Sequence, residues 1–203
     1  MAYVLGFFWA DGTLTINPRG GHYFVLESKD KKLLEQIQSS MGSNHKLTKR
    51  IHKINKAIAY RVQIGSKKMC QDLMRYGTGT QKTFRLELPR IPKNYFNDFL
   101  RGYFDGDGHV WSGLMHKERK TSLYVVQAGF TSCSYGFLES LKEKLQEKGL
   151  IGSLVKVNNA SAFRLQYSTK SSKMLHNLMY SNSQSLCLRG KKIKFCQKLK
   201  MRS

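Results

Sequence analysis

The chain has 203 residues, with 35 Lys or Arg against 13 Asp or Glu, so its formal net charge at pH 7 is +22. This balance favours a polyanionic partner, and 40% apolar content argues for a folded basic surface rather than a disordered tail. The first apolar run reaches Asp11 too soon for a signal peptide or a membrane span, which predicts a soluble intracellular protein without a membrane partner.

The first half of the chain alternates between helical and strand patterns. After an apolar opening segment, alternating residues surround a turn sequence at 18–21, and Asp30 stands where the N-cap of an amphipathic helix is expected. The predicted elements are strands over 13–17 and 22–27, a helix over 30–41, strands over 46–54 and 57–64, and a helix over 66–75. A linker is expected over 89–93.

The second half repeats this order. Its predicted elements are strands over 109–114 and 122–131, a helix over 135–148, strands over 154–157 and 162–167, a helix over 171–180, and a terminal basic helix over 191–201. Residues 60–64 match 163–167 at an offset of 103, whereas the opening segments lie 96 apart. The chain is therefore read as a duplication, with about eight extra residues near 112–122 of the second copy.

The two opening segments, 4–12 and 100–108, share one pattern: an apolar run with small residues at helical spacing, closed by Asp and Gly. Each would place its small residues on one helix face, so that two such helices can approach closely. Parallel packing would bring Asp11 and Asp107 out at the same end, and paired carboxylates point to a metal. The small residues are Gly6 and Ala10 in the first segment, and Gly102 and Gly106 in the second.

Cysteine spacing does not point to zinc. The four cysteines form no CxxC pair and have no histidine at ligand spacing, which favours reduced buried thiols. They are Cys70, Cys133, Cys187 and Cys196.

The chain resembles the single-chain, two-motif LAGLIDADG homing endonucleases. Both opening segments align without gaps with the nine-residue motif that gives this family its name. The resemblance implies an α+β fold of two pseudo-symmetric α-β-β-α-β-β-α half-domains, residues 1–88 and 95–203, joined by a linker over 89–94. Parallel motif helices would form their interface, and antiparallel sheets a DNA-binding saddle. The implied protein is a monomer that makes a double-strand break in a long, asymmetric DNA target.

The resemblance also implies a metal site. By motif position, Asp11 and Asp107 would coordinate divalent metal with help from the carbonyls of Ala10 and Gly106. Mg²⁺ is the expected ion, with Ca²⁺ or Mn²⁺ possible in vitro, and the expected reaction is two-metal phosphodiester hydrolysis.

A basic residue is expected near each site, just before the end of each half. Lys82 fits in the first half and Lys191 in the second, with Lys192 as the alternative to Lys191. Asp105 stands where the first motif has Trp9, and a packing or capping role is expected for it rather than metal ligation. Polar water-positioning residues are expected at strand ends, at Glu27 or Ser28 and at Thr131 or Ser132.

Strand alternation suggests the DNA-contacting face. Arg61 and Gln63 share one face of their strand, as do Arg164 and Gln166 in the other half, and both residue types can read purines in the major groove. The candidate contacts are Arg19, His22, Lys46, Lys49, Arg50, Arg61 and Gln63 in the first half, and Lys117, Arg119, Lys120, Lys156, Arg164 and Gln166 in the second.

Two other functions stay open. A splicing maturase could use the same surface on intron RNA, and a DNA-binding relative could lack cleavage, although two metal-free carboxylates facing phosphate would oppose binding. A general RNA-binding protein would explain the charge but not the paired acidic motifs. The sequence does not distinguish a bacterial or phage cytoplasm from an organelle matrix.

Overall fold

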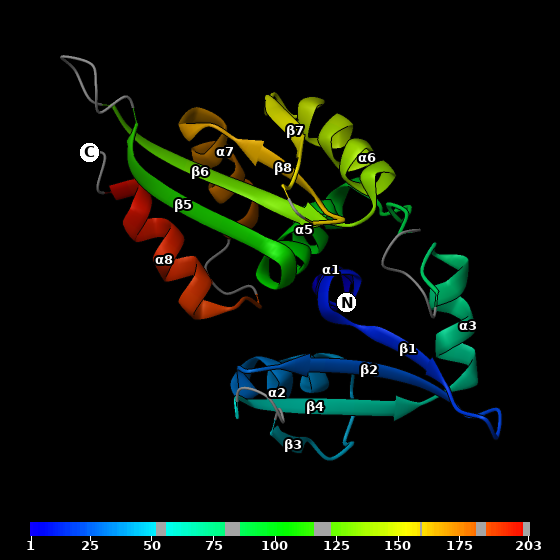
Figure 1. Cartoon of the computed structure of the whole chain (residues 1–203). Helices are drawn as coiled ribbons and strands as arrows, with labels where there is room; N and C mark the ends of the chain where they lie inside the picture. The colour runs from blue at the N-terminus through cyan, green and yellow to red at the C-terminus, as the bar shows by residue number, and fades with distance from the viewer. Residues whose placement is uncertain (52–55, 80–85, 116–122, 159, 182–185, 201–203) are drawn as a thin grey trace. The chain divides into compact units, whose positions relative to one another are not determined.

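The computed structural model describes residues 1–51, 56–79, 86–115, 123–158, 160–181 and 186–200 (Figure 1). Packing divides the chain into two compact units. One contains 1–82, 89–106 and 186–188, and the other contains 83–88, 107–185 and 189–203. This division differs from the expected half-domains 1–88 and 95–203, which follow the sequence repeat and stay a prediction.

The first unit holds an antiparallel sheet in the order β1-β2-β4-β3 (Figure 1). Its elements are α1 (Ala2–Asp11), β1 (Thr13–Ile16), β2 (His22–Ser28), α2 (Lys31–Ser40), β3 (Thr48–Ile51), β4 (Ile58–Gly65), α3 (Lys67–Arg75), the 3-10 turn η1 (Lys93–Tyr95) and α5 (Phe96–Asp107), whose last residue belongs to the second unit.

Local signals explain where the first unit's helices begin. The Asp30 carboxylate accepts a hydrogen bond from the Leu33 amide at 3.0 Å, and the Ser66 hydroxyl accepts one from the Met69 amide at 3.2 Å. Both side chains satisfy backbone donors that a helix start leaves without partners. The helices predicted over 30–41 and 66–75 are thus confirmed, including the Asp30 cap.

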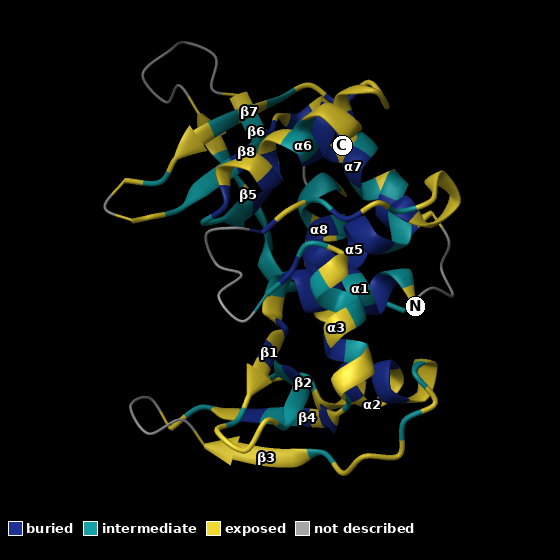
Figure 2. Cartoon of the chain, turned by 90° about the vertical axis from the view of Figure 1, so that its right-hand side faces the viewer, coloured by how far each residue is buried: buried dark blue, intermediate teal, exposed yellow. Residues whose placement is uncertain are grey.

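One face of the first sheet forms the core of that unit. Val62 of β4 is fully buried, and Phe24 of β2 stacks on Phe8 of α1 with ring centroids 4.6 Å apart. Leu33 and Leu34 of α2 are likewise buried. In contrast, β3 is exposed along its whole length (Figure 2). Along β4, Val62 and Ile64 are buried and Gln63 between them is exposed, as the predicted alternation of an apolar and a polar face requires.

The second unit repeats this order around an antiparallel sheet ordered β5-β6-β8-β7. Its elements are β5 (Gly108–Met115), β6 (Leu123–Ser132), α6 (Tyr135–Gln146), β7 (Gly152–Lys156), β8 (Phe163–Tyr167), α7 (Thr169–Tyr180) and α8 (Arg189–Lys200). The described residues therefore confirm the predicted α+β fold with a repeated α-β-β-α-β-β-α order.

The extra residues of the second copy lengthen its first hairpin. Strands β5 and β6 have 8 and 10 residues, whereas β1 and β2 have 4 and 7. Helix α7 is bonded to this hairpin through side chains, because the Thr169 hydroxyl accepts from the Val126 amide and the Ser172 hydroxyl from the Ala128 amide, at 3.0 and 2.9 Å. Thr169 and Ser172 are buried, so their hydroxyls provide hydrogen-bond acceptors for backbone amides in the interior of the protein.

Helices α7 and α8 meet around His176. Its ring centroid lies 5.1 Å from that of Phe195 and 5.2 Å from that of Tyr180. Burial lowers the pKa of His176, and the nearby Lys192 ammonium lowers it further, against a raising contribution from Asn177. The folded state therefore favours the neutral ring.

This pKa predicts acid destabilisation. Below the ordinary histidine pKa of about 6.5, His176 is protonated in the unfolded chain but stays neutral in the folded chain. The free energy of unfolding therefore decreases as the pH falls from about 6.5 toward the lowered pKa that His176 has in the folded protein. Thermal unfolding measured from about pH 8 to 5 should show a steeper loss of Tm in the wild type than in His176→Gln. Equal slopes in the two proteins would contradict this prediction.

In the part of the chain that the structure describes, no helix has the length and apolar character needed to cross a membrane.

Candidate functional site

The two motif helices, α1 and α5, pack with their backbones in contact inside the first unit. A Cβ added at Gly6 would overlap the Phe99 carbonyl oxygen, and one added at Gly102 would overlap the Tyr3 carbonyl oxygen. Farther along, Gly106 lies against Ala10. The contacts advance in the same direction on both helices, so the pair is parallel, as the resemblance implied, and it is as close as the small residues predicted.

This packing brings the Asp11 carboxylate beside the end of α5. Asp11 is exposed, and its Oδ2 lies 3.1 Å from where a Cβ of Gly106 would stand, so the carboxylate reaches the α5 backbone only because residue 106 is glycine. Asp107 is the next residue and ends the helix. A carboxylate beside the backbone of a helix end suits a hard divalent cation, which takes carboxylate, carbonyl and water oxygens.

Protein side chains alone do not enclose an ion here. Among the described residues, no group of three or more His, Cys, Asp and Glu is placed to hold a metal. An ion at the motif ends would therefore need backbone carbonyls, water or substrate oxygens as further ligands. The carbonyls expected for this role, those of Ala10 and Gly106, belong to the residues in contact at this end of the helix pair.

The two candidate lysines of α8 have different surroundings. The half-buried Lys191 ammonium donates a hydrogen bond to the Gly108 carbonyl at 2.9 Å, one residue after Asp107. The Lys192 ammonium instead lies 5.7 Å from the ring centroid of Tyr180. Lys82, the expected counterpart in the first half, lies outside the described residues.

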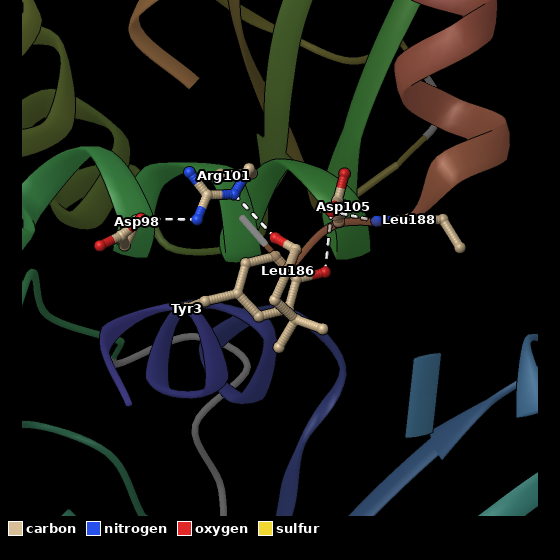
Figure 3. A network of polar contacts seen from close by, with 6 residues as sticks. All are labelled: Tyr3, Asp98, Arg101, Asp105, Leu186 and Leu188. Carbon is tan, nitrogen blue, oxygen red and sulfur yellow. Dashed lines mark hydrogen bonds and ion pairs between the residues drawn. The ribbon is translucent and has the colours of Figure 1, made fainter. Parts of the chain in front are cut away.

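Asp105 is engaged by protein donors. Its side chain is 3% exposed, and its Oδ2 accepts hydrogen bonds from the Tyr3 hydroxyl at 2.8 Å and the Leu188 amide at 2.6 Å (Figure 3). The residue at the same place in the first motif, Trp9, is buried and contacts Phe99 edge-on. These contacts agree with the packing and capping role expected for Asp105.

The register of the first sheet gathers part of the expected DNA-contact set on one face. Arg61 pairs with Glu27 on one side and Thr48 on the other, which puts these side chains on the face that Gln63 shares. Arg50 pairs with Ala59 and joins that face. Lys49 pairs with Tyr60 and points to the opposite face.

The second sheet has a corresponding face. Arg164 pairs with Thr131, and Gln166 with Gly129, whose other neighbour across the strands is His109. Lys156 pairs with Phe163, which puts it on the face opposite to Arg164. Thus the two halves carry Arg and Gln at equivalent positions, and each arginine lies beside a polar residue of the neighbouring strand, Glu27 for Arg61 and Thr131 for Arg164.

His109 belongs to this face and was not predicted. Burial first, then the positive charges of Arg164 and Lys191, lower its pKa to about 4, so its ring is neutral at neutral pH. Gly129 leaves room for it, because a Cβ there would lie 3.0 Å from the His109 ring. Its place beside the second Asp-Gly ending was the available sequence signal.

The other expected contacts are scattered. Arg19 is exposed in the turn between β1 and β2, and His22 bonds the Gly20 carbonyl at 2.9 Å. Lys46 is exposed just before β3. Lys117, Arg119 and Lys120 lie outside the described residues.

Sequence comparison identifies the fold family. The profile of the LAGLIDADG-like domain matches residues 1–76 and 96–186, which include both motif helices and both sheets. The chain belongs to the LAGLIDADG family. Among curated proteins, it is 37% identical over 78 residues to a probable translation initiation factor IF-2 of Thermococcus kodakarensis, covering 36% of this chain and 6% of that factor. It is 24% identical over 122 residues to the uncharacterized protein MJ0398 of Methanocaldococcus jannaschii, covering 58% of this chain and 42% of that protein.

Solved LAGLIDADG structures share the fold over nearly the whole chain. The homing endonuclease I-LtrWI bound to its target DNA aligns with a TM-score of 0.67 at 12% identity, covering 98% of this chain and 89% of its own. I-SmaMI, bound to uncleaved DNA in the presence of calcium ions, aligns with a TM-score of 0.66 at 13% identity, covering 99% and 91%. At this identity the likeness shows the fold alone.

Proposed function

We propose that this LAGLIDADG protein is a site-specific DNA endonuclease that cuts both strands of a long, asymmetric duplex by metal-dependent phosphodiester hydrolysis. The observation that carries the proposal is the glycine-lined crossing of α1 and α5, which puts the Asp11 carboxylate beside Gly106, one residue before Asp107. The net charge of +22 supports a nucleic-acid substrate. I-LtrWI and I-SmaMI, which share the fold, are described with bound DNA.

The motif ends supply the metal ligands in this proposal. Asp11 and Asp107 each offer carboxylate oxygens, and Ala10 and Gly106 offer backbone carbonyls, a donor set that suits Mg²⁺. When bound, such an ion activates water and stabilises the leaving oxygen. Glycine at position 106 lets the Ala10 methyl group and the Asp11 carboxylate approach the backbone of α5, because it has no side chain of its own.

Lysines supply positive charge in the same proposal. Lys191, held against the Gly108 carbonyl, stabilises the negative charge that develops on the phosphate oxygens. Its placement favours it over Lys192, which lies at the Tyr180 ring. Lys82 has the corresponding role in the first half.

The polar sheet faces bind the duplex. The Nε atoms of Arg61 and Arg164 are buried without a hydrogen-bond partner among the described residues. A buried donor without a partner costs free energy, so each arginine gains when its side chain reorients toward an acceptor that DNA offers. The repetition of this feature in both halves supports duplex contact along both sheets.

We expect Arg61→Ala and Arg164→Ala each to weaken target binding by about 1–3 kcal/mol, the usual range for an arginine that reads a base. Binding is measured in Ca²⁺ by fluorescence anisotropy at several salt concentrations. Lys173→Ala is the matched control, because Lys173 is exposed on α7 and its loss removes the same charge. An equal loss for the control would contradict specific contact by the arginines.

Selection for cleavage tests the function as a whole. A library of plasmids with randomised duplex inserts is incubated with the protein and Mg²⁺, and linear products are sequenced. The proposal predicts enrichment of one long, weakly palindromic sequence. Each strand of that sequence should be cut at one constant position. Cleavage of no duplex by the wild type, with tight binding of intron RNA, would overturn it in favour of a maturase.

A further inference from the structure

The segment just before α8, Leu186–Leu188, is fastened to α5 at two points, and we call it the strap. Arg101 Nε donates to the Leu186 carbonyl at 2.8 Å, and the Leu188 amide donates to Asp105 Oδ2 at 2.6 Å (Figure 3). Residues 101 and 105 are one helical turn apart, so both side chains emerge on the same face. The strap therefore lies along that face of α5, held at each end.

The side chains that hold the strap are buried and mutually supported. Arg101 is 4% and Asp105 3% exposed. Arg101 also forms an ion pair with Asp98 at 2.5 Å and lies over the Tyr3 ring, 5.5 Å from its centroid. The Tyr3 hydroxyl in turn donates to Asp105. Removing one member of such a buried charged network leaves the others without compensation, which makes the arrangement specific.

A second hydrogen bond continues the strap toward the candidate site. The bond from Leu188 to Asp105 is followed, three residues later along both segments, by the bond from Lys191 to the Gly108 carbonyl. Three residues span at most about 11 Å of chain. Because Leu188 is anchored, the backbone of Lys191 is confined to a small region, from which its ammonium reaches the Gly108 carbonyl.

The first motif lacks the side chains that hold the strap. At the 96-residue offset, Leu5 stands for Arg101 and Trp9 for Asp105. Neither residue can hold a backbone segment through a charged side chain. The device therefore belongs to the second half only, and its loss should affect the two active sites unequally.

We propose that Asp105, together with Arg101, is a positioning residue that holds Lys191 at the second active site, and that weakening it turns double-strand cleavage into nicking of one strand. This inference rests on the proposed nuclease function. A purely structural role for Asp105 predicts something different, because general destabilisation lowers the active fraction and slows both strands alike.

The test compares the cleavage rates of the two strands. Asp105→Asn keeps the side-chain shape but replaces the carboxylate with a neutral amide, whose oxygen accepts the Leu188 and Tyr3 hydrogen bonds more weakly. With a selected target labelled at either strand, we expect the rate of one strand to fall by about ten- to a hundredfold relative to the other. Nicked plasmid should accumulate. Lys191→Ala should slow the same strand.

Ser172→Ala is the matched control. It removes a buried hydroxyl that accepts a hydrogen bond from the Ala128 amide, and so lowers stability without removing the hydrogen bonds that Leu188 and Lys191 donate. Its two strand rates should keep the wild-type ratio. Equal slowing of both strands by Asp105→Asn, or slowing of the strand that Lys191→Ala leaves fast, would overturn the inference.

Hydrogen exchange gives a readout that does not depend on cleavage. In the DNA-free protein without metal, the Leu188 amide should exchange slowly in the wild type and in Ser172→Ala, and at least about tenfold faster in Asp105→Asn. Unchanged exchange would overturn the strap's dependence on Asp105. If the wild type cuts no duplex, the proposed function fails, whereas the exchange result still decides whether Asp105 holds the strap.

Discussion

Asp107→Asn is expected to lower double-strand cleavage by about a hundred- to a thousandfold, in line with the loss of one essential charge-stabilising group. Asparagine keeps the shape of the side chain but lacks the anionic oxygens that a hard divalent cation prefers. The same loss is expected for Asp11→Asn, because the wild-type Asp11 carboxylate lies beside Gly106. Cleavage is followed in Mg²⁺ on a selected target, from supercoiled to linear plasmid.

Binding separates this loss from misfolding. In Ca²⁺ both variants should bind the target within about tenfold of the wild-type affinity, because the arginines and lysines of the sheet faces supply most of the binding free energy. Asp72→Asn is the matched control, since that carboxylate pairs with the exposed side chains of Lys68 and Arg75 on α3. Wild-type cleavage by both motif variants would rule out their assigned role.

Local patterns account for most of the fold that could be predicted. Asp30 predicted the start of α2 because its carboxylate can accept a hydrogen bond from a backbone amide in the first turn, here that of Leu33. The alternation around Val62 predicted its burial, since strand side chains alternate between faces. Helix α5 begins at Phe96, ahead of the motif itself, because the preceding residues also pack into the core.

The parts that sequence reasoning missed depend on contacts between distant residues. Ser172 reads as an ordinary polar helix residue, yet it is fully buried against β6. Asp105 was expected to pack or cap, but its partner Leu188 lies 83 residues away, where no local pattern could indicate it. The choice between Lys191 and Lys192 likewise depends on which neighbour each side chain reaches.

Gly102→Ala is expected to destabilise the protein by about 3 kcal/mol, at the upper end of the usual cost of overpacking a core. The added Cβ would overlap the Tyr3 carbonyl oxygen and lie 2.8 Å from the Phe7 amide nitrogen. Both obstacles are backbone atoms, so the crossing of α1 and α5 must widen. The gain in helix propensity from Gly to Ala, up to about 1 kcal/mol, offsets only part of this cost.

Gly136→Ala provides the matched comparison for this substitution. Gly136 also lies in a helix, α6, but a Cβ there would meet nothing within 4 Å. It should therefore leave stability unchanged or raise it, whereas Gly102→Ala should lower Tm by about 10 °C. The close crossing also sets the distance from Asp11 to Gly106. The molecules of Gly102→Ala that remain folded should therefore cut DNA more slowly than folded wild-type molecules. If the two alanine variants unfold at the same temperature, the helices do not depend on backbone contact at Gly102.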